Sequence, residues 1–132
     1  MKKRTLIKSL ALSLVLSTIL GISAFAAGGE NYPISWSFNS TLTGAARSFT
    51  GGVMHLKATS WSAGTGEFNS ILYKKELLAD TNLGIRSLPK NGTSNVYWHG
   101  IKPGKYYIYL AQAFPHANYI DGYGTMNSYG GA

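Results

Sequence analysis

The sequence predicts an all-β protein: a single small β-sandwich of about seven short antiparallel strands, of Greek-key or jelly-roll type. Three observations predict this fold class. Short segments alternate apolar and polar residues, Gly, Asn, Asp and Pro recur between these segments, and helical periodicity is nearly absent after residue 26. The chain has no cysteine, so strand pairing and buried aromatic rings must stabilise the domain without disulfides.

The N-terminus has the layout of a secretory signal peptide. Four basic residues within the first eight precede an apolar stretch over 10–22, and Ala24-Phe25-Ala26 then offers a small-x-small cleavage site. A membrane span would need about 20 apolar residues, whereas this stretch contains Ser and Thr and ends in small residues. We therefore expect cleavage near Ala26, secretion of residues 27–132 as one domain, and no stable transmembrane insertion.

The charge of the remaining domain is mild. Residues 27–132 carry eight Lys and Arg against five Asp and Glu, a net charge of +3, with no basic run longer than Lys74-Lys75. This balance gives little support to nucleic acid as a partner and slight support to an anionic envelope polymer. A Lys-rich start without any cysteine favours a bacterial source.

The first three strands are expected in the first half of the domain. Large apolar residues occupy every second position of 34–38, which places them on one face of a strand. The same alternation over 54–59, between glycine-rich turns, predicts a second, half-buried strand. A third strand is expected from about Glu67 to Leu77, and its two partly apolar faces are typical of a central strand.

The next two strands surround a turn signal. Residues 83–88 form a short fourth strand that Pro89 ends, and 94–99 form the fifth. Asn91-Gly92 lies between them, and both residue types tolerate the positive φ of a tight hairpin turn.

A second hairpin is expected around Pro103-Gly104. Its arms are 94–99 and the sixth strand, 105–113, whose β-branched and aromatic residues suit a sheet interior. Residues 123–129 either add a seventh strand or form a loose Tyr/Gly-rich C-terminal end.

Residues 72–113 contain a recurring order of strand and turn features. These are Leu72-Tyr73, Asn91-Gly92, Val96-Tyr97-Trp98 and Ile101 to Ile108. With these features the segment resembles the C-terminal half of small extracellular bacterial β-sandwiches, such as those appended to secreted peptidases. The resemblance identifies no family, and it implies a noncatalytic accessory or binding fold.

No residue pattern points to catalysis. The histidines, His55, His99 and His116, lie far apart in the sequence and lack the spacing of metal ligands, so no metal or other cofactor is expected. The five carboxylates include no pair that the sequence singles out for glycoside hydrolysis. The chain also lacks Gly-x-Ser-x-Gly and any cysteine nucleophile, and we therefore expect that it is not an enzyme.

The feature of the sequence that best indicates a function is its content of aromatic residues. All three Trp and all nine Tyr lie after residue 26, and many fall in the expected hairpin of 94–99 and 105–113. If Trp98, Tyr106 and Ile108 point inward, alternation sends their neighbours to the opposite face, where rings could stack on sugars. The alternative is that both faces are covered and the tyrosines only pack. The candidate aromatic platform comprises Tyr97, His99, Tyr107 and Tyr109, with Lys102 and Lys105 at its rim.

Three functions fit these observations. The leading one is a small secreted noncatalytic β-sandwich that binds an extracellular or cell-surface polymer, either a polysaccharide or a cell-wall component. The second is a secreted antimicrobial or antagonistic protein that acts on neighbouring cells. The third is a component of an extracellular matrix or coat, in which tyrosine-rich edges promote assembly. The sequence does not predict the oligomeric state.

Overall fold

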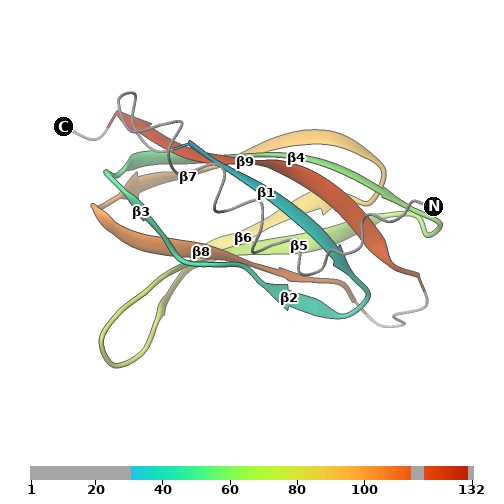
Figure 1. The fold of residues 1–132 in the computed structure, drawn as a ribbon, viewed down its shortest axis with the longest axis horizontal. Helices are drawn as coiled ribbons and strands as arrows, with labels where there is room; N and C mark the ends of the chain where they lie inside the picture. The colour runs from blue at the N-terminus through green and yellow to red at the C-terminus, as the bar shows by residue number, and fades with distance from the viewer. Residues whose placement is uncertain (1–30, 114–117, 131–132) are drawn as a thin grey trace.

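A computed structural model describes residues 31–113 and 118–130, which form two antiparallel sheets packed face to face (Figure 1). The expected signal peptide and His116 lie outside the described residues. Within the described ranges, no helix is long and apolar enough to cross a membrane. The strands are β1 (Asn31–Phe38), β2 (Thr41–Thr43), β3 (Arg47–Phe49), β4 (Gly52–Ser62), β5 (Glu67–Lys74), β6 (Thr81–Pro89), β7 (Gly92–Ile101), β8 (Gly104–Ala111) and β9 (Ile120–Gly130).

The strand order is that of a jelly roll. One sheet has four strands in the order β1-β9-β4-β7, and the other has five, in the order β2-β8-β5-β6 with β3 also paired to β8. Strands β2 and β3 pair with successive parts of β8, so they act as one interrupted strand. Counted in this way, each sheet has four strands, and the crossovers between the sheets form the double Greek key of a jelly roll. The predicted β-sandwich is confirmed.

The core lies between the two sheets and follows the period of two that strands impose. On β4, Met54, Leu56 and Ala58 are all buried, while the residues between them face outward. Large rings from both sheets fill the centre, and Trp98 of β7 and Tyr106 of β8 are each 1% exposed. The expectation that these two side chains point inward is confirmed.

The hairpin expected from 94–99 and 105–113 is wrong. Strand β7 pairs with β4, whereas β8 pairs with β5 in the other sheet. Pro103 lies in the short turn that carries the chain from one sheet to the other. Alternation correctly gave the inward side chains, but two strands facing one another across a core show the same alternation as two strands paired in one sheet.

Asn91-Gly92 also does not close a hairpin, because β6 and β7 belong to different sheets. Gly92 adopts a φ of 122°, as its turn chemistry suggests. The Asn91 side chain joins two other segments: its Oδ1 accepts from the amide of Ser62 at 2.8 Å, and its Nδ2 donates to the carbonyl of Gly64 at 2.9 Å. The Asn91 side chain therefore holds the β4–β5 loop in place. The backbone at Asn91-Gly92 carries the chain from β6 in one sheet to β7 in the other.

Several strand boundaries differ from expectation. Strand β5 is central, as predicted, but it ends at Lys74 instead of Leu77, because residues 75–80 form a loop. The C-terminal segment is a strand, β9, and it pairs with both β1 and β4. Its glycines permit this position, since a Cβ at Gly124 would lie 1.9 Å from the backbone oxygen of Lys57. The three-residue strands β2 and β3 are too short to show alternation and were not predicted.

Candidate binding surface

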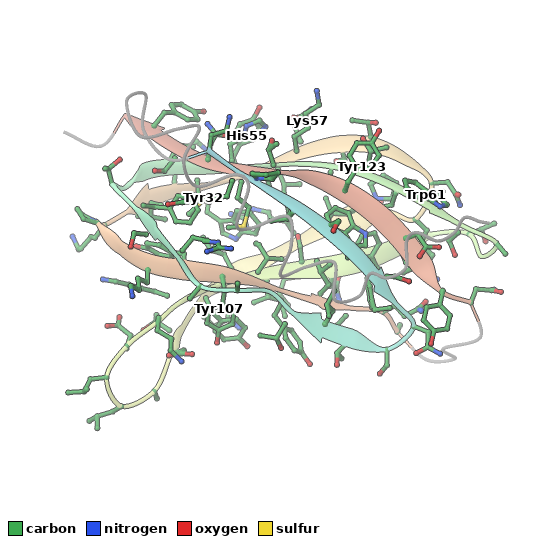
Figure 2. All side chains as sticks on the ribbon, viewed as in Figure 1. Tyr32, His55, Lys57, Trp61, Tyr107 and Tyr123 are labelled. Carbon is green, nitrogen blue, oxygen red and sulfur yellow. The ribbon has the colours of Figure 1, made fainter. Side chains whose placement is uncertain are left out.

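The outward side chains of β4, β7 and β9 form one surface, which we call the β4 face (Figure 2). Along β4, His55, Lys57 and Trp61 point away from the core, on the upper side of the molecule as drawn. His55 and Trp61 are six residues apart, which is roughly 20 Å at the rise of an extended strand. The β4 face is therefore long enough for an extended ligand.

One end of the β4 face is built around a histidine. The rings of His55 and Tyr97 stack at 4.8 Å with an interplanar angle of 11°, and His99 lies 6.4 Å from Tyr97. Nδ1 of His55 is 3.0 Å from Oδ1 of Asn127, and its Nε2 is 2.8 Å from Oδ1 of Asn95. The imidazole is thus held between one side chain from each neighbouring strand, which fixes the orientation of the stacked pair.

The other end carries two well-exposed rings, Trp61 and Tyr123. Trp61 and Tyr123 pack edge to face at 5.9 Å, yet they remain 49% and 55% exposed. The register places Tyr123 opposite Thr59, one outward position before Trp61, so the two rings meet diagonally across β4 and β9. Two large rings that are half open to solvent, and held by each other, offer a preformed stacking surface.

Polar groups fill the space between the two ends. The hydroxyls of Thr59 and Thr93 are 2.8 Å apart. Lys57 extends into solvent near the middle, and among the described residues it forms no ion pair (Figure 2). Such a surface can stack on rings, exchange hydrogen bonds with hydroxyls and meet a negative charge.

Acidic side chains are rare on the part of the β4 face that the structure describes. Hydrolysis of a glycan needs two carboxyl groups that flank the scissile bond, and Asp121 is the sole carboxylate on the outward positions that the structure describes here. In residues 31–113 and 118–130, no group of three or more His, Asp or Glu side chains could hold a metal ion.

The structure divides the predicted platform between two sheets. Tyr97 and His99 lie on the β4 face, whereas Tyr107 and Tyr109 lie on the outer face of the five-stranded sheet, on the opposite side of the molecule. Of the two rim residues, Lys102 follows β7 and Lys105 lies on β8. The six predicted residues therefore do not form one site.

Tyr107 has structural partners in its own sheet. Its ring stacks on Tyr73 at 5.3 Å, and Tyr73 also meets Tyr109 edge to face at 6.2 Å. The Tyr107 hydroxyl donates to Oδ2 of Asp80 at 2.6 Å, and this hydrogen bond raises the pKa of Tyr107 to about 12. The same hydrogen bond lowers the pKa of Asp80, with help from the backbone amide of Glu76. Tyr107 thus packs within its own sheet, as the alternative to an exposed binding platform predicted.

The sequence analysis missed Trp61 and Tyr123, the two most exposed members of the Trp61 end of the β4 face. Extending the alternation of 54–59 by one more outward step would have placed Trp61 beside Lys57 and His55. No local signal indicates Tyr123, because β9 pairs with β4 from more than 60 residues away in the chain.

A small cleft opens between β1 and the interrupted strand β2–β3. Apolar side chains, including Trp36 and Met126, line it, and its volume is about 30 Å³, which is room for about one or two water molecules. At its edge the guanidinium of Arg47 lies 5.5 Å from the ring centre of Tyr32, and burial lowers the pKa of Arg47.

Comparison with known proteins gives a fold and no family. No family model matches the sequence, and no curated protein matches it. Among solved structures, a periplasmic inhibitor of g-type lysozyme from Aeromonas hydrophila, PliG, is similar with a TM-score of 0.50 and 15% identity, over 78% of this chain and 90% of that one. The likeness shows the fold alone. A CBM4 structure has a TM-score of 0.43 and 10% identity, over 75% of this chain and 81% of that one.

Proposed function

We propose that this chain is a secreted, noncatalytic binding protein whose β4 face binds a linear polysaccharide of extracellular or cell-wall origin. One observation carries the proposal: exposed aromatic groups stand at both ends of a rigid sheet surface about 20 Å long, with polar side chains between them. One pair is His55–Tyr97 and the other is Trp61–Tyr123.

The chemistry of a sugar chain matches this arrangement. Each sugar ring presents C–H groups on its faces, which pack on aromatic rings, and hydroxyls at its rim, which exchange hydrogen bonds with side chains such as Asn95 and Thr59. The rings of the β4 face are already held by stacking and hydrogen bonds, so little side-chain freedom is lost on binding. Lys57 would favour a polymer that carries carboxylate or phosphate groups.

Export belongs to the same proposal. A signal peptide over residues 1–26 would place the sandwich outside the cell, where wall glycans and exopolysaccharides are the abundant polymers. Mass spectrometry of the secreted protein tests this part, with an N-terminus at or near Ala27 expected. Intact Met1 on the protein in the medium would contradict it.

Retention on insoluble polymers tests the binding function. We expect the secreted protein to be retained by at least one of peptidoglycan, cellulose, chitin or an acidic exopolysaccharide. Trp61→Ala and Tyr123→Ala should each weaken retention about 5- to 10-fold, the effect of losing one stacked ring. Tyr109→Ala, which removes a ring from the opposite outer face, is the matched control and should be retained like the wild type. Equal losses in all three variants, or no retention by any polymer, would refute the proposal.

The same preparation separates the two alternative functions. Growth inhibition of neighbouring bacteria without polymer retention would favour the antagonist. Concentration-dependent assembly without retention or inhibition would favour the matrix or coat component.

A further inference from the structure

The loop over residues 75–80, between β5 and β6, projects from the end of the five-stranded sheet (Figure 1, lower left). At its tip Leu77 and Leu78 are 97% and 96% exposed, far more than any other large apolar residue with a recorded exposure. Ala79 follows them, so three consecutive apolar residues face water. Burial of a leucine side chain normally stabilises a protein, and these two adjacent leucines are not buried. Exposed apolar patches of this kind often mark interaction sites.

Polar contacts at the base hold this loop in its projecting position. Oδ1 of Asp80 accepts from the amide of Glu76 at 3.0 Å, and Oδ2 of Asp80 accepts from the Tyr107 hydroxyl at 2.6 Å. The Thr81 hydroxyl donates to Oε2 of Glu76 at 3.2 Å, and the amide of Lys75 donates to the Lys105 carbonyl at 2.8 Å. Hydrogen bonds at its base therefore hold the loop that carries the exposed leucines.

Lysines surround the base of the loop. Lys74 ends β5 and Lys75 begins the loop, while Lys102 and Lys105 belong to the adjacent β7–β8 turn and the start of β8. Together they are half of the eight cationic side chains after residue 26. The two local carboxylates each lie near one lysine, with Nζ of Lys74 4.0 Å from Glu76 and Nζ of Lys75 3.9 Å from Asp80. The four lysines thus exceed the two carboxylates, and the base keeps a net positive charge of two.

We propose that loop 75–80 inserts its two leucines into the interface of an anionic lipid bilayer, with the lysines at its base against the headgroups. An apolar tip above a cationic base combines an apolar insert with a basic patch, and two such signals hold a protein on an anionic membrane better than either alone. Tyr73 and Tyr109, on the same outer face, are of a type enriched where hydrocarbon meets water. The tip residues 77–79 have no polar side chain that could make directional contacts with a protein pocket, which favours hydrocarbon as the occupant.

This inference does not depend on the polysaccharide function. The β4 face lies on the outer side of the other sheet, so a lipid-bound molecule would leave it free (Figures 1 and 2). Experiments can accordingly refute either proposal without refuting the other.

Vesicle co-sedimentation of the secreted protein tests the inference. We expect binding to vesicles of phosphatidylethanolamine and phosphatidylglycerol, and at least about tenfold weaker binding to pure phosphatidylcholine, because anionic lipid attracts the lysines. The double substitution L77S/L78S should reduce binding to the anionic vesicles by about tenfold or more. Because both leucines are exposed, its thermal unfolding and its retention on polysaccharide should match the wild type.

Two controls isolate the roles of tip and base. Ile85→Ser changes another exposed apolar residue, on strand β6 away from the tip, and should bind vesicles like the wild type. K75Q/K102Q should lower the preference for anionic vesicles and leave the leucine dependence intact. Absence of sedimentation with any vesicle, or unchanged sedimentation of L77S/L78S, would overturn the proposal. Leucine-dependent binding to cells that persists after lipid extraction would also overturn it, in favour of a protein partner.

Discussion

At the scale of single residues, Trp98 shows how one side chain joins the two sheets. It is 1% exposed, its Nε1 donates to the carbonyl of Gly84 on β6 at 3.0 Å, and the Arg86 guanidinium lies 5.2 Å from its ring centre. Arg86 also donates from Nε to the carbonyl of Tyr97 at 2.9 Å. These contacts close the side of the sandwich where β6 and β7 run past each other without pairing.

Trp98→Ala should cost about 3 to 5 kcal/mol of unfolding free energy, as truncation of a large core aromatic does. Trp98→Phe should cost less, since it keeps most of the buried ring and gives up the hydrogen bond to Gly84. Urea unfolding of the two variants measures both values. A loss below about 1 kcal/mol for the alanine variant would show that the ring is not a core element.

The Tyr107–Asp80 hydrogen bond predicts a pH dependence at both ends of the scale. The pKa of Tyr107 is raised to about 12, so its contribution to stability is complete below the unfolded value of about 10 and is lost as pH rises through about 12. The pKa of Asp80 is lowered, so its contribution is present above about pH 4 and is lost as pH falls through the folded pKa.

Asp80→Asn should therefore bring the pKa of Tyr107 back toward 10, because it removes the charged acceptor. Titration of tyrosinate absorbance should show one fewer late-titrating tyrosine in this variant. Asp121→Asn removes a carboxylate on the other sheet and serves as the control. An identical absorbance titration for D80N and the wild type would contradict the role of this bond.

At the scale of strands, the sequence showed which side chains share a face but not which strands are neighbours. Alternation correctly assigned the inward residues of β4, β7 and β8 because burial on one side of a strand repeats every second residue. It could not distinguish pairing in one sheet from packing across the core, so β7 and β8 were wrongly joined. In a jelly roll most neighbours come from distant parts of the chain, and turn chemistry such as Asn91-Gly92 then marks a crossing between sheets.

Glycines in β9 mark where this strand meets β4 most closely. Gly124→Ala should be strongly destabilising, by about 2 kcal/mol or more, because the new Cβ would lie 1.9 Å from the Lys57 carbonyl oxygen and would force β4 and β9 apart. Gly66→Ala should cost only about 1 kcal/mol, since its φ of +95° is unfavourable for alanine but nothing lies within 4 Å. Thermal unfolding of the two variants compares them directly. A Gly124 variant as stable as the Gly66 variant would show that the pairing adjusts easily.

At the scale of the whole molecule, the jelly roll gives the protein two outer faces with different chemistry. Pairing of β4 with β9 brings Trp61 and Tyr123 together across more than 60 residues of sequence, which is why sequence patterns alone could not assemble the β4 face. The opposite sheet carries the tyrosine cluster and the projecting leucine loop. Such a molecule could hold a glycan on one side while its loop contacts a lipid surface on the other.

The central claim is that the β4 face binds a sugar chain, and NMR chemical-shift mapping with soluble fragments of the retained polysaccharide tests it most directly. We predict shifts confined to β4, β7 and β9, with the largest at His55, Tyr97, Trp61 and Tyr123, and an affinity that rises with fragment length until the chain spans both aromatic pairs. Shifts centred on Tyr73, Tyr107 and Tyr109, or spread over both sheets without dependence on fragment length, would contradict the account.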